Sequence, residues 1–401
     1  MTHWGDAPVL RTIRLLLLGD THLGFDQPRR PRVERRRRGA DFLANYHRAL
    51  QPAKDGEVDL VVHGGDVFNR SKASSDLVMD AFEPLKAIAN RGIPVFLVPG
   101  NHERSKIPSP LLAIHPNIHI FDQPKTAFVT KRGLKVACMG FPYVRRGLRT
   151  SFMDVLSDCG SQAAPADIRL LCLHHCIEGA TVGPNDYVFR RGDDVIVGAD
   201  LPTDVAAVLS GHIHRHQVLT TDLSGRQLPA PVFYAGSVER TSFAERDEQK
   251  GFMILEMEAD GSPGGKVSNW QFHKLPTRPM TQMEAPTDCH SSDDAQHWLR
   301  GLARDTVADT ILRIRVPQAS RTFWLPQLSA PSLRKLFRPS VNVEVAVVAA
   351  RSNRTVPTKQ APARTLKIEV PGSKHLPSTP GQLNGWAQRR GVWGEAAIEK
   401  R

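Results

Sequence analysis

Five short polar segments, each placed directly behind an apolar run, constrain this 401-residue chain more than any other feature. They are Gly19-Asp20-Thr21-His22, Gly64-Gly65-Asp66, Gly100-Asn101-His102-Glu103, His174-His175 and Gly211-His212-Ile213-His214. Continuous apolar runs predict buried strands with both faces covered. A chain that ends strand after strand in Asp, Asn or His gathers these side chains around one point, and the simplest purpose is to hold metal ions.

The donor types and their number indicate which kind of metal site this is. Histidine, carboxylate and carboxamide donors without a thiolate suit Mn, Fe or Zn, and we take Mn as the favoured ion. Seven ligands are too many for one ion that keeps an open position, but they suit two divalent ions that share a bridging carboxylate. Two ions about 4 Å apart activate water and clamp a phosphoryl group, so phosphoester hydrolysis is the predicted reaction.

His102 has a different predicted role. It lies next to Asn101 in the sequence and is not needed as a ligand. A histidine beside two metal ions can protonate the leaving oxygen or stabilise charge in the transition state. We therefore predict that His102 is the catalytic residue.

Composition bears on partners and compartment. The net charge of +12 favours a polyanionic partner such as nucleic acid, although an anionic membrane surface would also suit it. The run Ile13–Leu18 is too short for a signal peptide or a membrane span, so we expect a cytoplasmic protein without a membrane partner. The five cysteines are odd in number and irregularly spaced, so we interpret them as small buried hydrophobes in a reducing compartment.

The order of apolar runs predicts an α/β (α+β) fold. Early strands alternate with helical patterns, including a helix over 75–88, and the later sequence is rich in strands. We predict a four-layer α-β-β-α sandwich of two mixed sheets flanked by helices over residues 1–275. A small α+β capping domain is expected over 276–350, followed by a basic, weakly ordered tail over 351–401.

The five segments, in this order and at these intervals, resemble the calcineurin-like metallophosphoesterase family over roughly residues 10 to 260. The resemblance implies a double β-sheet sandwich with a two-metal centre. By motif position, Asp20, His22 and His214 would hold one ion, and Asn101, His174 and His212 the other, with Asp66 bridging. His174 is preferred to His175 because it directly follows the strand.

Two stretches resemble one branch of this family, the nuclease subunits of the SbcC–SbcD type of DNA-repair complex. They are Asp20-Thr-His-Leu-Gly-Phe25 and Tyr234-Ala-Gly-Ser-Val-Glu-Arg-Thr-Ser-Phe243. This resemblance implies a capping domain beside a DNA cleft, a coiled-coil ATPase partner of the SbcC kind, and a homodimer.

An arginine-rich loop supports a DNA substrate independently of the resemblance. Seven of the ten residues in 29–38 are arginines, a few positions past His22. A solvated face would repel itself at this charge density, so we favour contacts to backbone phosphates by Arg35, Arg36 and Arg37. Asn69 is a further candidate for substrate binding. It stands where the nucleases commonly have a histidine, and an amide cannot carry a proton, so exonuclease activity is in doubt.

These features together predict a two-metal phosphodiesterase that hydrolyses DNA phosphodiester bonds, as an exonuclease or endonuclease in DNA repair. The alternative enzyme is a phosphodiesterase or phosphatase that acts on a small substrate. A third hypothesis is a non-catalytic scaffold that binds DNA or a partner through the basic loop. The polarity of digestion, the physiological metal and the role of residues 351–401 stay open.

Overall fold

The computed structural model describes residues 12–26, 38–108, 113–160, 165–318 and 321–348. The predicted basic tail over 351–401 lies outside the described residues. So do Arg35, Arg36 and Arg37 of the arginine-rich loop. The strands and helices below are therefore those of the described part of the chain.

The first large sheet contains six strands in the order β16-β15-β1-β2-β3-β4. Their bounds are β16 Lys266–Lys274, β15 Gly251–Glu258, β1 Thr12–Leu18, β2 Leu60–His63, β3 Val95–Leu97 and β4 Ile118–Ile120. Strands β1 to β4 are parallel, β15 is antiparallel to β1, and β16 is antiparallel to β15. The parallel strands therefore end at one common edge of the sheet.

The second large sheet also contains six strands, in the order β13-β14-β12-β7-β6-β5. Their bounds are β13 Gln217–Thr221, β14 Gln227–Tyr234, β12 Ala207–Ser210, β7 Ile168–Leu173, β6 Leu134–Gly140 and β5 Lys125–Lys131. The four central strands are parallel, and the two edge strands, β13 and β5, are antiparallel to their neighbours. Both large sheets are therefore mixed, as predicted.

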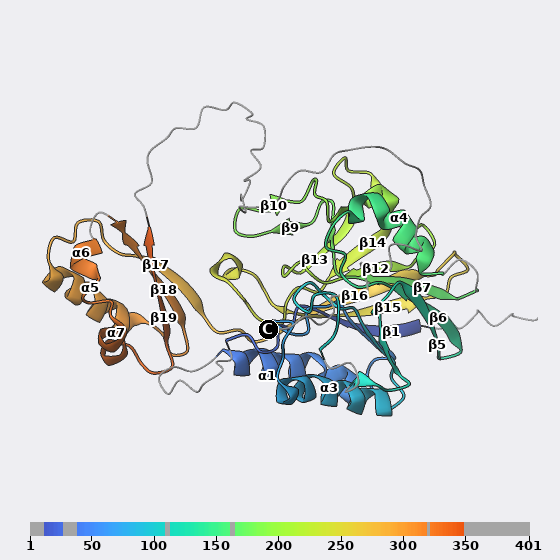
Figure 1. Cartoon of the computed structure of the whole chain (residues 1–401), viewed down its shortest axis with the longest axis horizontal. Coiled ribbons are helices and arrows are strands. Elements are labelled where there is room, and N and C mark those ends of the chain that lie inside the picture. Colours follow the sequence, from blue (N-terminus) through green and yellow to red (C-terminus); the bar gives the residue numbers. More distant parts are fainter. Residues whose placement is uncertain (1–11, 27–37, 109–112, 161–164, 319–320, 349–401) are drawn as a thin grey trace, which may run out of the picture. The chain divides into compact units, whose positions relative to one another are not determined.

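Helices cover the outer faces of the two sheets. Helices α1 (Gly39–Ala49) and α3 (Ser75–Asn90) lie on one side of the strand layers, and α4 (Leu148–Asp158) lies on the opposite side (Figure 1). A short helix, α2 (Gln51–Asp55), follows α1. Ser74 caps α3 by accepting a hydrogen bond from the Leu77 amide at 3.3 Å. The four-layer α-β-β-α sandwich is confirmed.

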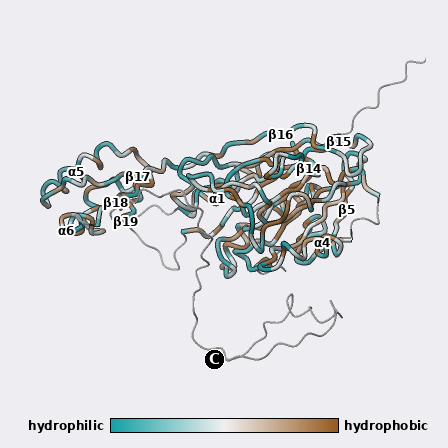
Figure 2. The backbone as a smooth tube through the Cα atoms, turned by 90° about the horizontal axis from the view of Figure 1, so that it is seen from above, coloured by the Kyte–Doolittle hydropathy of each residue, from teal (hydrophilic) through white to brown (hydrophobic). Residues whose placement is uncertain are grey.

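Three apolar clusters fill the three spaces between these four layers. Strand β1 shows why the apolar runs early in the sequence have no alternating polar residues. Leu16 and Leu18 pack into the cluster shared with α1 and α3. Ile13, Leu15 and Leu17 point the other way, into the cluster between the two sheets. Successive residues of a strand point to opposite faces, so a strand buried on both faces needs an unbroken apolar run. Apolar residues gather along the strands of the large sheets (Figure 2).

The segment after the first large sheet forms a small sheet with helices and an apolar cluster of its own. Parallel strands β17 (Met280–Glu284), β18 (Ile311–Pro317) and β19 (Asn342–Val348) make a three-stranded sheet. The helices of this unit are α5 Ser292–Asp305, α6 Arg321–Trp324 and α7 Ala330–Leu336. The fully buried Trp324 anchors an apolar cluster made only of residues from this segment. We call residues 280–348 the small C-terminal unit.

Two details sharpen the expectations from sequence. Gly261 to Gly265 is the turn of the β15–β16 hairpin, not a linker, so the first sheet extends to Lys274. All five cysteines are free and buried, which confirms their interpretation as small core residues. Among the described residues, no helix combines the length and the apolar content that crossing a membrane requires.

Candidate metal centre

The predicted ligands all follow the carboxyl ends of parallel strands, and they come from both large sheets. Asp20 and His22 follow β1, Asp66 follows β2, and Asn101 follows β3 in the first sheet. The second sheet contributes His174 after β7, and His212 with His214 after β12. Because ligand-bearing loops from both sheets meet, the site lies where the ends of the two sheets converge.

The first group of donors contains Asp20, His22 and His214. One ligand atom from each lies within 4.8 Å of the others. The Nε2 atoms of His22 and His214 are 2.9 Å apart, and His214 Nε2 is 3.9 Å from Asp20 Oδ1. The Nε2 atoms of His22 and His214, which lie on separate loops, therefore face one another directly.

The second group contains Asn101, His174 and His212. Asn101 Oδ1 lies 3.0 Å from His174 Nε2 and 3.0 Å from His212 Nδ1. Asp66 Oδ2 lies 3.4 Å from His174 Nε2 and 3.9 Å from His22 Nε2. The Asp66 carboxylate therefore stands between the two groups of donors, as a bridging ligand must.

The electrostatics of the site suit bound cations. Asp20 is fully buried and its Oδ2 has no hydrogen-bond partner among the described residues. Burial raises the pKa of Asp20, and burial with help from Asp66 raises the pKa of Glu103 to about 8. Burial also lowers the pKa of His22, with His214 adding to the effect, and lowers that of His212 to about 3. Neutral imidazoles and uncompensated buried carboxylates are what a divalent cation stabilises.

The pKa values of His174 and Asp66 also indicate a site that a divalent cation would stabilise. Burial lowers the pKa of His174, but the neighbouring Asp66 outweighs burial and raises it to about 9. Burial opposes ionisation of Asp66, yet the surrounding imidazoles, His174 first, hold the pKa of this carboxyl below its ordinary value. The carboxylate thus attracts positive charge strongly, and a divalent cation would take the place of the proton on His174. The residues present fit two divalent metal ions.

Four of the seven predicted ligands have an unusual backbone conformation. The φ angles are 49° at Asp20, 42° at His22, 50° at Asp66 and 76° at His212. Residues other than glycine seldom adopt positive φ, although Asp and His tolerate it better than most. Such strain costs about 1–3 kcal/mol for each residue and gathers at functional sites. Here it turns each side chain sharply inward at the end of its strand.

Glu103 holds two of these loops together. Its carboxylate accepts hydrogen bonds from the Phe68 amide at 2.6 Å and from the Gly100 amide at 2.8 Å. A Cβ atom at Gly100 would overlap the Asp66 carboxylate, so only glycine permits this approach. The Gly-Asn-His-Glu segment therefore fixes the position of Asp66 as well as supplying Asn101.

His102 lies beside both donor groups, and with His22 and Asp66 it forms a third set of possible metal donors. Its Nδ1 donates to the backbone carbonyl of Asn69 at 2.8 Å, and its Nε2 lies 3.9 Å from Asp66 Oδ2. The ring centroid is 4.6 Å from that of His22, and 37% of the side chain is exposed. Nε2 therefore points toward the centre while Nδ1 holds the ring in place. Asn69 acts on His102 through its backbone, so this contact does not depend on the amide side chain.

The structure separates the roles of His174 and His175. His174 lies in the second donor group, and its Nδ1 donates to the Gly64 carbonyl at 2.7 Å. His175 Nε2 instead accepts from the Val144 amide at 3.0 Å, and its ring stacks on Tyr143 with centroids 4.8 Å apart. His175 thus supports the loop beside the site, and His174 stays the predicted ligand of the two.

Two residues near His214 were not identified from the sequence. Glu245 Oε1 lies 3.2 Å from His214 Nδ1, and Lys250 Nζ lies 2.6 Å from Glu245 Oε2. Both follow shortly after the stretch from Tyr234 to Phe243 that carries the resemblance to the DNA-repair branch, but no motif spacing links them to His214. A buried lysine is also rare enough that the sequence gives no reason to expect one.

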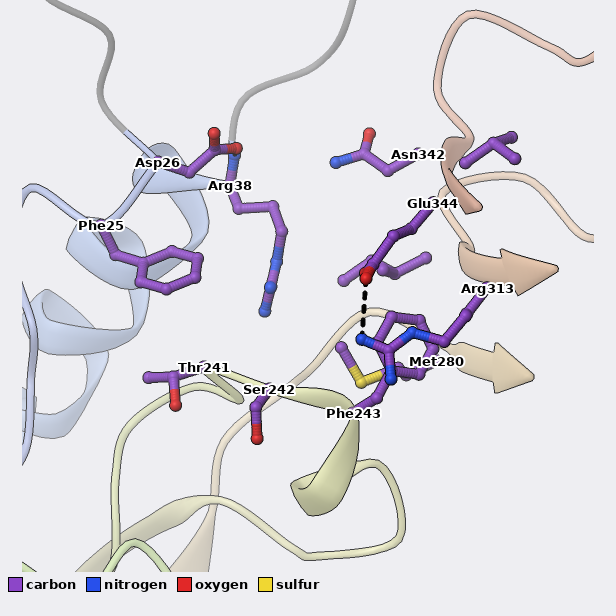
Figure 3. A pocket seen from close by; sticks show the side chains of 12 residues that line it. Phe25, Asp26, Arg38, Thr241, Ser242, Phe243, Met280, Arg313, Asn342 and Glu344 are labelled. Atoms are coloured by element: carbon purple, nitrogen blue, oxygen red, sulfur yellow. Dashed lines mark hydrogen bonds and ion pairs between the residues drawn. The ribbon is translucent and has the colours of Figure 1, made fainter. Parts of the chain in front are cut away.

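A cavity of about 470 Å³ lies beside the loop that follows His22 (Figure 3). Its walls come from that loop, from Thr241–Phe243 and from strands β17 to β19. The Arg313 guanidinium lies 3.9 Å from the centre of the Phe243 ring and donates to Glu344. Nε of Arg38 and Nε of Arg313 are buried without a hydrogen-bond partner within the described part of the chain. Two arginines therefore line the cavity beside apolar side chains.

Comparisons with known proteins show which family the chain belongs to. Residues 13–216, about half of the chain, match the family described as calcineurin-like phosphoesterase. The DNA double-strand break repair protein Mre11 of Haloferax volcanii is 29% identical over 253 residues, which cover 62% of this chain and 50% of the relative. The SbcD component of the Bacillus subtilis nuclease SbcCD is 26% identical over 338 residues, covering 76% of this chain and 79% of the relative.

A crystal structure of a hypothetical protein from Thermus thermophilus covers 66% of this chain and 99% of its own, at 15% identity and a TM-score of 0.37. The chain spans about half the length of the Haloferax relative. From the match of residues 13–216, the chain belongs to the calcineurin-like phosphoesterase family, and it is related to the Mre11 and SbcD nucleases.

Proposed function

We propose that this chain is a two-metal phosphodiesterase that hydrolyses DNA phosphodiester bonds, as an exonuclease or endonuclease in DNA repair. The observation that carries the proposal is the pair of donor groups that meet at Asp66, with His102 beside them. In this proposal Asp20, His22 and His214 hold one ion. Asn101, His174 and His212 hold the other, and Asp66 bridges the two.

The proposed ions are divalent, with Mn favoured over Fe or Zn because the donors include carboxylate and carboxamide oxygen but no thiolate. When bound, two such ions supply Lewis acidity that activates water and neutralises charge on a phosphoryl group. The protein contributes by holding the donors on strained loops, which keeps them aimed at one place before any substrate arrives.

His102 is the proposed catalytic residue. Donation from Nδ1 to the Asn69 carbonyl orients the ring, so that Nε2 faces the site. A protonated ring can then pass a proton from Nε2 to the leaving oxygen, or stabilise negative charge on a phosphate oxygen. Asn69 is kept as a candidate phosphate contact through its partly buried side chain.

DNA is the proposed substrate because three separate observations favour it. Two relatives carry names that refer to DNA break repair and to a nuclease. The net charge is +12, and seven arginines crowd residues 29–38 next to the loop of His22. Arg38 and Arg313, which line the cavity beside that loop, add positive charge there. A coiled-coil ATPase partner of the SbcC kind, a homodimer and a cytoplasmic location form part of the same proposal.

The test compares DNA cleavage with hydrolysis of a small chromogenic phosphodiester, both with Mn. We expect cleavage of linear or single-stranded DNA and tight binding of the same DNA at low salt. Turnover of the small ester without DNA binding would favour the alternative, a phosphodiesterase or phosphatase for a small substrate. DNA binding that His102→Ala leaves intact, with no cleavage by either protein, would instead favour a non-catalytic scaffold.

The arginine-rich loop gives a sharper version of this test. The triple variant Arg35→Gln, Arg36→Gln and Arg37→Gln should weaken DNA binding and reduce the salt dependence by up to about three phosphate contacts. It should leave turnover of the small ester unchanged. The control is Arg300→Gln with Arg304→Gln on the exposed face of α5, where the arginines meet Gln296 and Asp305. Equal losses per charge removed in both variants would show that only total charge matters.

A further inference from the structure

We infer that Glu245 and Lys250 are positioning residues that set the metal affinity of one half of the centre, the half formed by Asp20, His22 and His214. This inference rests on the two-metal centre of the proposed function. We expect Glu245 and Lys250 to change the affinity for one of the two ions and not for the other.

The contact that starts the argument is between Glu245 and the far nitrogen of His214. Glu245 Oε1 lies 3.2 Å from His214 Nδ1, while His214 Nε2 faces His22 Nε2 at 2.9 Å. A carboxylate that accepts from Nδ1–H fixes the proton on that nitrogen and leaves the Nε2 lone pair free for a cation. It also makes the imidazole a better donor. Glu245 thus selects the tautomer and the orientation that the first half-site needs.

The carboxylate of Glu245 is itself held from several sides. Thr241 Oγ1 donates to Glu245 Oε1 at 2.5 Å, and Ser242 Oγ donates to the same oxygen at 3.3 Å. The other oxygen, Oε2, lies 2.6 Å from Lys250 Nζ. A side chain with both oxygens engaged has little freedom to rotate away from His214. Its position is therefore built into the fold.

Lys250 links the ring of His214 to the backbone of the same residue. Its side chain is fully buried, with 0% exposure, and Nζ donates to the His214 carbonyl at 2.9 Å. Nζ also contacts Glu245 and, at 2.9 Å, Glu248 Oε2. An ammonium group has three protons, and these three acceptors use all of them. One buried cation thus holds both the main chain of His214 and the carboxylate that orients its ring.

The other imidazoles of the centre are held differently. His174 Nδ1 donates to a backbone carbonyl, that of Gly64, at 2.7 Å. Nδ1 of His22 is buried and has no hydrogen-bond partner among the described residues. A backbone carbonyl carries no formal charge and cannot be altered by a side-chain substitution. Only the half-site of His214 is therefore expected to respond to changes at Glu245 and Lys250.

The experiment measures metal bound to the full chain, not activity. Metal-free protein is dialysed against graded concentrations of free Mn²⁺, and bound Mn is counted per chain. The wild-type protein should bind two ions. Glu245→Ala should keep one ion at wild-type affinity and need an about 10- to 100-fold higher concentration for the other. Glu245→Gln keeps an oxygen acceptor for Nδ1–H and should show a smaller shift.

Two further variants distinguish the possible outcomes. Glu258→Ala is the matched control, because Glu258 pairs with Lys266 at 4.0 Å on the β15–β16 hairpin and touches no predicted ligand. Asp66→Asn is the reference for the centre itself and should weaken both ions. If Asp66→Asn weakens binding but Glu245→Ala binds both ions normally, the inference about Glu245 is wrong and the two-metal centre stands. If Asp66→Asn also binds both ions normally, the proposed centre itself is wrong.

Glu245 and Lys250 are buried, so a single substitution could prevent folding. The double variant Glu245→Gln with Lys250→Met removes both charges and keeps the volume filled. Circular dichroism and the thermal midpoint establish that it is folded. The double variant should again lose affinity for one ion only, and equal loss of both ions would overturn the inference.

Discussion

The two large sheets make unequal contributions to the candidate centre. The first sheet supplies all the oxygen donors, from Asp20, Asp66 and Asn101, together with His22 and the neighbouring His102. The second supplies only imidazoles, those of His174, His212 and His214. The carboxylates of the candidate centre therefore come from one sheet, and the other sheet contributes imidazole nitrogens only.

This difference shows that neither sheet alone supplies a complete group of metal donors. Each of the two donor groups takes members from both sheets, since His214 joins Asp20 and His22, while His174 and His212 join Asn101. The comparison can be tested by substitutions that act on one sheet at a time, or on the joint between the sheets.

The largest effect is expected at the bridging position of the first sheet. Asp66→Asn should lower turnover of a phosphodiester by about 10⁴-fold, the scale seen when a principal group of an active site is removed. It should also weaken both ions, because Asp66 is near donors of both groups. His174→Ala in the second sheet should weaken one ion only. Metal counting and kcat/KM measurements check this, and equal metal loss in both variants would contradict it.

The next effect concerns His102, the group of the first sheet that we place outside the ligand set. His102→Gln should lower kcat by about 10²- to 10⁴-fold, because an amide cannot transfer a proton. The content of bound metal should stay at the wild-type level. Loss of an ion together with the loss of kcat would show that His102 is a ligand, and the oxygen-rich sheet would then supply five donors.

Metal removal should loosen the packing of the two sheets. A ligand that binds only the folded chain stabilises it by about 2.7 kcal/mol at 100 times its Kd, and by about 4.1 kcal/mol at 1,000 times. Urea denaturation with saturating Mn and with a chelator measures the difference in free energy of unfolding. The same stability in both conditions would mean that the ions do not bridge the sheets.

The smallest effect is expected at the joint itself. A Cβ atom at Gly64, after β2, would lie 2.8 Å from the Gly211 amide nitrogen, after β12. Gly64→Ala should therefore cost about 1–3 kcal/mol of stability by forcing the two loops apart. Gly301→Ala is the control, because a Cβ there meets nothing within 4 Å and the residue lies in helix α5. The Gly301→Ala variant should be neutral or stabilising. An equal loss of stability in both variants would show that the Gly64–Gly211 contact has no special role.

Much of the fold could be predicted because its central strands are buried on both faces. Runs such as Leu60–His63 and Ile168–Leu173 are mostly apolar and buried, so their composition and length identify them. Edge strands escaped prediction for the opposite reason. β5 (Lys125–Lys131) and β16 (Lys266–Lys274) are largely polar and partly exposed, and nothing local distinguishes them from loops.

The predicted ligands could be proposed from sequence because each follows a recognisable apolar run. The residues that hold His214 in position could not be found in this way. Glu245 reaches His214 from 31 residues away, and Lys250 reaches it from 36. Neither distance corresponds to a local element, so only the folded arrangement of β12, β14 and β15 brings them together. Asn69 illustrates a further limit, because the structure uses its backbone carbonyl, which every residue possesses.

Each donor group takes residues from both sheets, and Gly64 and Gly211 bring the loops of the two sheets into contact. This arrangement has a consequence for the order in which folding and metal binding occur. In the proposed centre, full metal affinity requires that the two sheets have already docked in the correct register. We therefore expect metal binding to follow assembly of the sandwich, and we expect a chain whose sheets have not docked to bind neither ion and to have no hydrolytic activity.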